Sequence, residues 1–316
     1  MIVRFGLDHL RPTLAEVGIE RPFLIASPRW DSLELPPSVG RLSELPAAEV
    51  EVPDEADGIL AIGGGSAIDT AKFASAEAGK PVVHVPTTYS GAEWTTTYGI
   101  RTPDRRIRGS GGGARPVAIV YDVELTLSLP RAVTAGTAMN ALAHCAEALY
   151  AARRSPEGDA EALAGAPMIA RALPLVLAGP DDREARAELL RGAAHAGHAL
   201  ALAGLALAHA MAQALGGTFG LPHGAMNALC LPPALAFNRA VVPDEVAAFG
   251  DAVGGDPVER SRALALLGGF ERLRDHGVPR DELADVAAAA AARAGNQANP
   301  RPATADEIQA MFVSIW

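Results

Sequence analysis

The sequence predicts two domains: an α/β domain built on a parallel sheet (residues 1–129), followed by an all-α helical domain (residues 130–316). Short apolar runs separated by glycine and proline fill the first part, as is typical of buried parallel strands. Long alanine- and leucine-rich segments with helical spacing fill the second part. Pro130 stands at the change, where a proline suits the start of a helix, and no proline follows before Pro156.

The elements follow this division in order. Strands are predicted at four apolar runs, namely residues 22–26, 58–62, 81–88 and 116–122. Helices of the second domain are separated by the stretches "RRSPEGD", "AGPDD", "GGTFGLPHG" and "HGVPRDE". The most apolar stretch, "AGHALALAGLALAHAMAQALGG", contains histidines and glycines, so we expect a buried helix and no membrane span.

Composition excludes several classes of protein. The net charge of −10 and the isoelectric point near 5.3 exclude a nucleic-acid partner, because such proteins normally present a basic face. Two cysteines, Cys145 and Cys230, are too few for a disulfide framework. The N-terminal residues lack the charged and apolar regions of a secretory signal, so we expect a cytoplasmic protein.

A glycine-rich turn joins the second predicted strand to a helix. Gly63, Gly64 and Gly65 follow the strand directly, and Ser66 follows them. Such a turn exposes backbone N–H groups at the positive end of the helix dipole, which favours a phosphate group. A second glycine run, residues 109–113, precedes a strand and is expected to form a hairpin tip or flap.

A loop of hydroxyl groups follows the third predicted strand. Thr87, Thr88, Tyr89 and Ser90 leave that strand in succession. The carboxyl ends of parallel strands lie at one edge of a sheet, where ligands bind, so this loop and the glycine turn are expected to form one pocket.

Histidines recur at helical spacing in the second domain. Asn140 and His144 are four residues apart, as are His209 and Gln213, and His223 follows. A single histidine on an apolar helix is usually a hydrogen-bonded core residue. An i, i+4 pair of ligand-type residues with two further histidines is spacing typical of metal ligands, and it favours a functional cluster over three core residues.

Four stretches, "GGGSAIDTAK", "PTTYSGAEWT", "MNALAHCAEALY" and "HAMAQALGGTFGLPHG", resemble in this order the iron-containing alcohol dehydrogenase superfamily. "PTTY", "GGTFGLPHG" and the late "NPRP" resemble its maleylacetate reductase branch. The resemblance implies an α/β nucleotide-binding domain, a helical domain and hydride transfer from NADH or NADPH to a small acidic or carbonyl substrate. A homodimer is the expected assembly.

The resemblance also assigns residues. It implies cofactor contacts at Gly63, Gly64, Gly65, Ser66, Asp69, Thr87 and Thr88, and catalytic roles for Tyr89, His144, His209 and His223. Hydride addition to a ketone builds an alkoxide, and an imidazole can donate the proton that it needs. An acidic substrate also needs polar and cationic partners, for which the candidates are Asn140, Gln213, Arg106, Arg108 and Arg301.

Three features depart from the family pattern. Metal-dependent relatives have Asp at the position of Asn140, so we predict a protein without a stoichiometric catalytic metal. Gln213 stands where His is usual. Only residues 27–58 separate the first two predicted strands, and they contain five prolines, where the family places a helix, a strand and another helix. This interval predicts an abridged parallel sheet.

Three function classes remain open from the sequence. The first is an NAD(P)H-dependent reductase of maleylacetate type. The second is an enzyme on the same scaffold that has lost hydride transfer and performs acid/base or lyase chemistry, as Gln213 and the short interval suggest. The third is a non-catalytic small-molecule binding protein.

Overall fold

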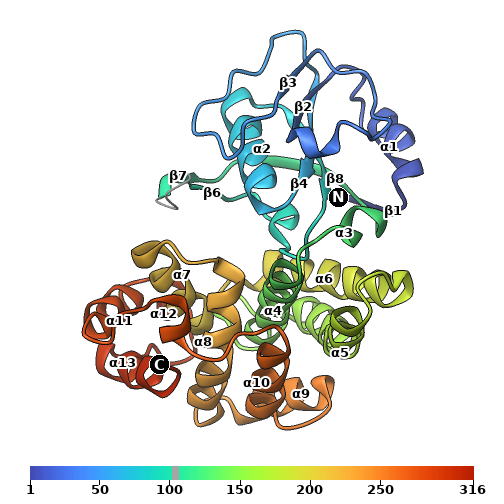
Figure 1. Cartoon of the computed structure of the whole chain (residues 1–316). Helices are drawn as coiled ribbons and strands as arrows, with labels where there is room; N and C mark the ends of the chain where they lie inside the picture. Colours follow the sequence, from blue (N-terminus) through green and yellow to red (C-terminus); the bar gives the residue numbers. More distant parts are fainter. Residues whose placement is uncertain (102–106) are drawn as a thin grey trace. The chain divides into compact units, whose positions relative to one another are not determined.

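The computed structural model describes residues 1–101 and 107–316 (Figure 1). Contacts between residues divide the chain into two compact units. The first, which we call the sheet unit, contains residues 1–88 and 92–128. The second, the helical unit, contains residues 129–316 together with Tyr89–Gly91, a short piece of the loop that follows a strand of the sheet unit.

A six-stranded parallel sheet forms the centre of the sheet unit. Its strands, in spatial order, are β1 (Ile2–Phe5), β8 (Arg115–Tyr121), β5 (Pro81–Pro86), β4 (Gly58–Gly63), β2 (Pro22–Ala26) and β3 (Gly40–Leu42). Every residue of β2 and β4 is buried, which explains their uninterrupted apolar sequences. The predicted α/β fold is confirmed, whereas β1 and β3 were not among the predicted strands.

Residues 27–57 correct the expectation of a missing strand. They contain β3, which pairs with β2 through Phe23 opposite Gly40, and a 3₁₀ helix at Pro28–Trp30. In this fully described interval no α-helix forms, because its prolines remove N–H donors and clash with a helical backbone. The sheet therefore keeps its edge strand, and what is shortened is the helical part of the connection.

Helices cover both faces of this sheet. Leu10 and Leu14 of α1 (Leu10–Glu16) pack with Leu24 and Leu60 on one face. On the other face, Ile68 of α2 (Gly65–Ala78) packs with the alternate strand residues, among them Ile25 and Ile59. Successive strand residues point to opposite faces, so each buried strand supplies both cores. A short helix, α3 (Glu124–Leu127), follows β8.

The second glycine run does not form a hairpin tip. Gly109–Gly111 lie in β7 (Ile107–Gly111), which pairs antiparallel with β6 (Tyr98–Arg101). A Cβ on Gly111 would lie 2.6 Å from the hydroxyl oxygen of Tyr98, so a larger residue there would displace the end of that side chain. Gly109–Gly111 thus belong to a strand of a hairpin and not to its tip, so the expectation of a tip is wrong and that of a flap stays a prediction.

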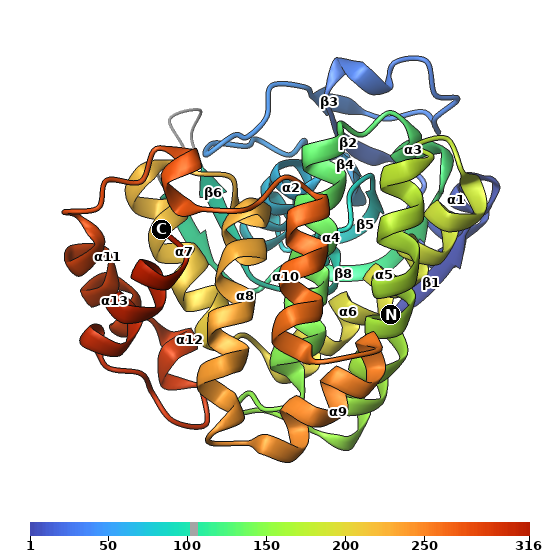
Figure 2. The same cartoon turned by 60° about the horizontal axis from the view of Figure 1, so that its bottom comes forward.

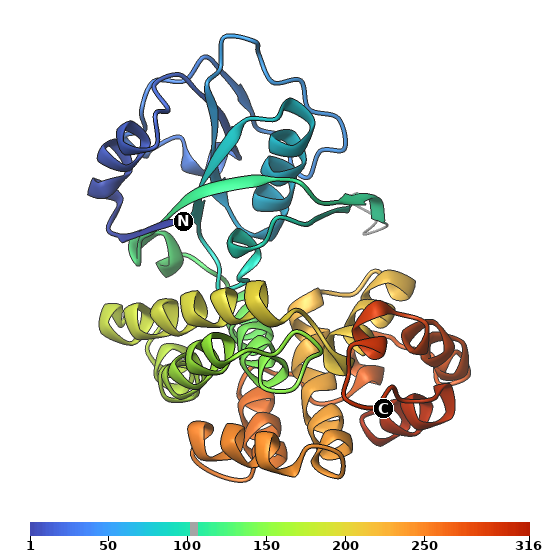
Figure 3. The same ribbon diagram turned by 180° about the vertical axis from the view of Figure 1, so that it is seen from behind.

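The helical unit contains the helices α4 (Arg131–Ala148), α5 (Pro156–Ala178), α6 (Arg183–Ala203), α7 (Leu207–Phe219), α8 (His223–Arg239), α9 (Pro243–Val253), α10 (Pro257–Leu267), α11 (Leu283–Ala291), α12 (Ala294–Gln297) and α13 (Ala305–Ser314). Pro130 is the N-cap of α4, at the predicted change of character. Figure 2 shows α4, α8 and α10 side by side, and Figure 3 shows α5 lying along α6. Thus α4, buried along most of its length, is the central helix of this unit.

The most apolar stretch forms two helices and not one. Its chain turns by 99° between α6 and α7. Gly204, which ends α6, has φ of +83°, a conformation that side-chain-bearing residues rarely adopt. The turn brings the first residues of α7 against α4, where the predicted histidines lie.

Candidate functional site

The glycine turn of the sheet unit excludes side chains at two positions. Gly63 has φ of +153°, and a Cβ on it would lie 2.7 Å from the Cβ of Ala67. A Cβ on Gly64, the N-cap residue of α2, would lie 2.9 Å from Cγ2 of Thr88. No side chain caps this end of α2. The turn therefore presents N–H groups at the start of a helix, with no room for a larger residue.

The hydroxyl loop is tied to this turn. The backbone N–H of Thr87 donates to the carbonyl of Gly63 at 3.0 Å. The hydroxyl of Thr88 is buried and, among the described residues, has no hydrogen-bond partner. Such a hydroxyl normally binds something, so it marks a place for a polar ligand beside Gly64. Ser66, in the first turn of α2, is exposed.

Asp69 makes structural contacts one turn further along α2. One carboxylate oxygen lies 2.7 Å from Nζ of Lys72, and the other accepts from the N–H of Gly99 at 3.3 Å. The ammonium group of Lys72 is buried and also donates to the carbonyl of Ala92. Both oxygens of Asp69 thus help to neutralise a buried cation and to hold β6.

Tyr89 is enclosed within the helical unit. Its side chain has no exposed surface, and its hydroxyl accepts from Nη1 of Arg186 at 3.2 Å. Arg186 itself is almost fully buried on α6 and was not predicted from the sequence. In this structure Tyr89 therefore orders the loop, whereas a role that touches a reacting group requires it to be accessible.

The loop residues next to Tyr89 contact the predicted helix face. The carbonyl of Ser90 accepts from Nδ2 of Asn140 at 3.0 Å. Gly91 has φ of +74°, and a Cβ on it would lie 3.0 Å from Cα of Gly197 and 3.3 Å from Nδ1 of His144. Glycine is required at this approach, which encloses His144.

Helices α4, α7 and α8 bring three histidines together. The rings of His144 and His209 are stacked with centroids 4.7 Å apart, and the ring of His223 lies 5.8 Å from that of His209. Nε2 of His209 lies 3.3 Å from Oδ1 of Asn140. We call these four residues the histidine cluster. His223 is its partly exposed member, while the other three are buried.

Glu147 belongs to the same site, and the sequence reasoning missed it. Its carboxylate is fully buried and accepts from Nδ1 of His209 at 2.7 Å and from the N–H of Ala206 at 2.8 Å. The N–H of His209 donates to the other oxygen at 3.2 Å. Glu147 lies three residues after His144 on α4, and this spacing on an apolar helix was the available signal.

Asn227 is a second residue that the sequence reasoning missed. Its Nδ2 donates to Oδ1 of Asn140 at 2.7 Å and contacts Nε2 of His223 at 3.0 Å. An amide nitrogen only donates, so Nε2 of His223 accepts this hydrogen bond. Oδ1 of Asn140 therefore receives Asn227 from one side and faces His209 on the other.

The three histidines differ in their electrostatic surroundings. Burial, and then the neighbouring rings of His209 and His223, hold the pKa of His144 well below its usual value of 6.5, so His144 is neutral. His209, in contrast, faces the carboxylate of Glu147 at Nδ1 and the amide oxygen of Asn140 at Nε2. Two oxygen acceptors suit a ring that carries a hydrogen on each nitrogen.

Of the predicted substrate-binding residues, Asn140 lies in the histidine cluster, whereas Gln213 and Arg301 have other partners. The side-chain oxygen of Gln213 accepts from Nη1 of Arg293 at 3.4 Å, and its backbone carbonyl accepts from Nη2 at 3.1 Å. Arg301 pairs with Glu307 at 3.0 Å and stacks over the ring of Phe237. Arg301 therefore already has an anionic partner in Glu307, and its role toward a substrate stays a prediction. Arg106 lies outside the described residues, as does the side chain of Arg108.

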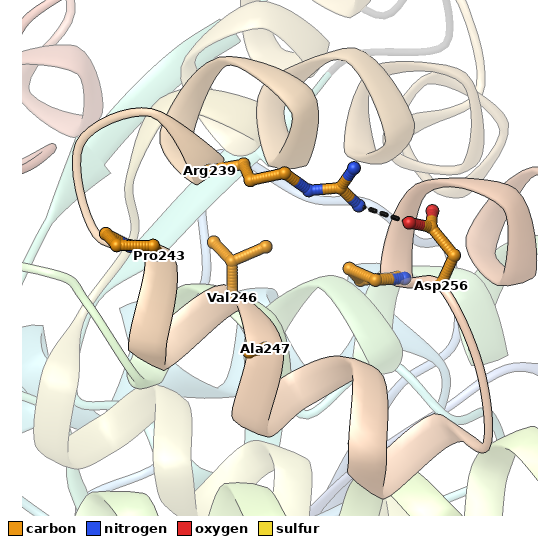
Figure 4. A pocket seen from close by; sticks show the side chains of 6 residues that line it. Arg239, Pro243, Val246, Ala247 and Asp256 are labelled. Carbon is orange, nitrogen blue, oxygen red and sulfur yellow. Dashed lines mark hydrogen bonds and ion pairs between the residues drawn. The ribbon is translucent and has the colours of Figure 1, made fainter.

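A surface cavity of about 320 Å³ lies apart from these residues (Figure 4). It is bounded by Arg239 of α8, Val246 of α9 and Asp256 before α10. The figure shows Arg239 and Asp256 turned toward each other, and their side chains pair at 2.6 Å. Because each charge already has its partner, this cavity is not a candidate active site.

Comparison with known proteins identifies the family. Residues 134–316 match the C-terminal region of the Fe-containing alcohol dehydrogenase family, and residues 45–123 match iron-containing alcohol dehydrogenase. The chain belongs to the iron-containing alcohol dehydrogenase family.

Relatives of this family member include maleylacetate reductases. It is 39% identical to maleylacetate reductase of Sphingobium indicum over 264 residues, which cover 83% of this chain and 74% of the relative. Maleylacetate reductase from Agrobacterium tumefaciens superposes with a TM-score of 0.88 at 28% identity, covering 100% of this chain and 95% of that structure. A putative alcohol dehydrogenase of Ralstonia eutropha gives 0.89 at 31% identity, with the same coverage.

The family name implies iron, and the histidine cluster does not fit it. The cluster contains no carboxylate, which iron(II) sites of this kind usually include. Two of the candidate ligand atoms are also already engaged, since Nδ2 of Asn227 binds both Oδ1 of Asn140 and Nε2 of His223. Within residues 1–101 and 107–316, no three acidic, histidine or cysteine side chains are arranged to hold a metal ion.

The substitution Asn140→Asp is expected to create affinity for zinc or iron. It places an anion beside Nε2 of His209 and within reach of Asn227, among four side chains that contain no carboxylate of their own. Calorimetric titration with zinc and elemental analysis of the purified variant measure the gain. Gln213→Glu adds the same charge to α7 beside Arg293 and serves as the control. Equal metal content in both variants would contradict this prediction.

Proposed function

We propose that this protein is an NAD(P)H-dependent reductase of a small keto acid or a related carbonyl compound. The observation that carries the proposal is the 39% identity to a maleylacetate reductase over 83% of the chain, which includes both the glycine turn and the histidine cluster. The open start of α2 and the cluster supply the two groups that such a reaction needs, a phosphate cradle and a proton source.

The glycine turn fits a dinucleotide. Gly63 and Gly64 leave space that a Cβ would fill, and the buried hydroxyl of Thr88 lacks a partner among the described residues. A pyrophosphate at the N–H groups of Gly64 and Gly65 is stabilised there by the helix dipole. When bound, NADH or NADPH supplies the hydride.

The histidine cluster supports the proton transfer. Reduction of a ketone leaves negative charge on oxygen, and a nearby imidazolium both stabilises this charge and donates the proton. His209, with acceptors at both ring nitrogens, is the member suited to hold that proton. His223, partly exposed, is the member suited to meet a substrate, and neutral His144 packs behind them.

Titration of the purified protein with NADH and with NADPH tests this function. We expect quenching of tryptophan fluorescence by at least one cofactor and oxidation of that cofactor when maleylacetate is added. Other small keto acids and aldehydes, assayed in the same way, define the substrate class. An enzyme that has lost hydride transfer, or a binding protein, gives no cofactor oxidation with any of these compounds, and that result would overturn the proposal.

A further inference from the structure

The buried carboxylate of Glu147 is the only acidic side chain that the described contacts place against the histidine cluster. It comes from α4 and meets the first turn of α7, directly after the 99° turn at Gly204. Ala206, the N-cap residue of α7, makes no side-chain cap, and Glu147 accepts from two N–H groups at this helix start, those of Ala206 and His209. The helix dipole also favours its negative charge.

We propose that Glu147 is a positioning residue of the reductase: it fixes the hydrogen of His209 on Nδ1 and thereby directs Nε2 toward Asn140. The role in turnover rests on the proposed function. The placement of the hydrogen does not, because it follows from the contacts alone.

Two backbone hydrogen bonds hold the carboxylate in place. One oxygen accepts from the N–H of Ala206 at 2.8 Å, and the other accepts from the N–H of His209 at 3.2 Å. The oxygen bound to Ala206 also contacts Nδ1 of His209 at 2.7 Å. With both oxygens tied to the same helix turn, the carboxylate cannot rotate away from the ring without losing these bonds.

The contact with Nδ1 decides the form of the ring. An ionised carboxylate only accepts hydrogen bonds, so Nδ1 must carry a hydrogen at 2.7 Å. The other neutral form of the ring would place a lone pair against the carboxylate. Nε2 is then the nitrogen at which a proton can be held or released, and its hydrogen, when present, donates to Oδ1 of Asn140, whose amide is held by Ser90 and Asn227. A hydrogen-bonded carboxylate that orients a catalytic imidazole is known to influence kcat strongly, since the wrong form of the ring cannot act.

The first test is nitrogen-15 NMR of the histidine rings in the wild-type protein. We expect a protonated Nδ1 for His209, with the signal assigned by its loss in His209→Asn. A neutral ring with its hydrogen on Nε2 alone would overturn the proposal. This measurement needs neither turnover nor a variant of Glu147, so it decides the placement of the hydrogen even if the protein proves to have no reductase activity.

The second test is Glu147→Gln. The single glutamine oxygen can still accept from the N–H of His209, but its NH₂ group then faces Nδ1 as well as the N–H of Ala206, and it favours the ring form with hydrogen on Nε2. We expect this change in the NMR spectrum and a loss of at least ~10²-fold in kcat, with KM values for substrate and cofactor changed by less than about threefold. An unchanged ring form, or an unchanged kcat in the folded variant, would count against the role.

Glu161→Gln is the matched control. Glu161 also accepts from a histidine at 2.7 Å, through Nδ1 of His195, but on the partly exposed faces of α5 and α6. This control should keep both kcat and KM. Glu147→Asp, which keeps the charge on a shorter side chain, should recover part of the activity if orientation by the anion is the role of Glu147. Recovery no greater than that of Glu147→Gln would contradict it.

Discussion

Replacing His209 by asparagine is expected to lower kcat by ~10² to 10⁴-fold, the range typical of a group that transfers a proton. The amide nitrogen of asparagine can take the place of Nδ1 and still donate to Glu147, so the start of α7 is expected to remain ordered. What disappears is the titratable ring between Glu147 and Asn140. The KM of the cofactor should change little, because the glycine turn is not altered.

The measurement combines steady-state kinetics with thermal melting. His195→Asn is the control, because His195 also contacts a glutamate through Nδ1 at 2.7 Å but lies outside the cluster. It should retain wild-type kcat. If His209→Asn melts early yet turns over normally when folded, the ring of His209 is structural and the proton comes from another group.

Replacing Gly64 by valine is expected to abolish detectable binding of NADH and NADPH, a loss of at least ~10²-fold in affinity, about 2.7 kcal/mol. Even a bare Cβ at this position lies 2.9 Å from Cγ2 of Thr88. A branched side chain there would also cover the N–H groups at the start of α2. The backbone of Gly64 has a negative φ of −82°, so valine strains no backbone dihedral there, and the side chain of Thr88 is what has to shift to admit it.

Fluorescence titration and a melting curve separate binding from folding. Gly99→Val is the control, because Gly99 lies in β6 and a Cβ on it meets nothing within 4 Å. This variant should bind the cofactor as the wild type does. If Gly64→Val binds NADH or NADPH normally, the phosphate cradle lies elsewhere in the chain.

The fold was predicted best where a buried element has a recognisable apolar pattern in its sequence. Strands β2 and β4 are buried at every residue, so their apolar runs were recognised. Strand β3 has only three residues, none of them fully buried, and a proline-rich approach that resembles a loop. The division between α6 and α7 also escaped prediction, because a single glycine in an apolar stretch does not reveal a turn of 99°.

The site residues that share one helix were predicted from helical spacing. The residues whose role depends on contacts between different helices were missed. Asn140 and His144 share one face of α4, and that relation is visible in the sequence. The role of Glu147 is visible only from its contacts with the start of α7, some 60 residues later in the chain. Arg186 likewise resembles a surface residue until Tyr89 is placed beside it.

Because Tyr89–Gly91 belong to the helical unit, a fragment that starts at residue 129 does not contain the whole of that unit. A fragment that encodes residues 129–316 contains every member of the histidine cluster, yet it lacks the carbonyl of Ser90 that binds Asn140 and the glycine that covers His144. The cluster is thus completed by a tripeptide encoded about 40 residues before the helical segment begins. The integrity of the cluster therefore depends on this tripeptide, so residues 129–316 alone are not an independent module for domain exchange.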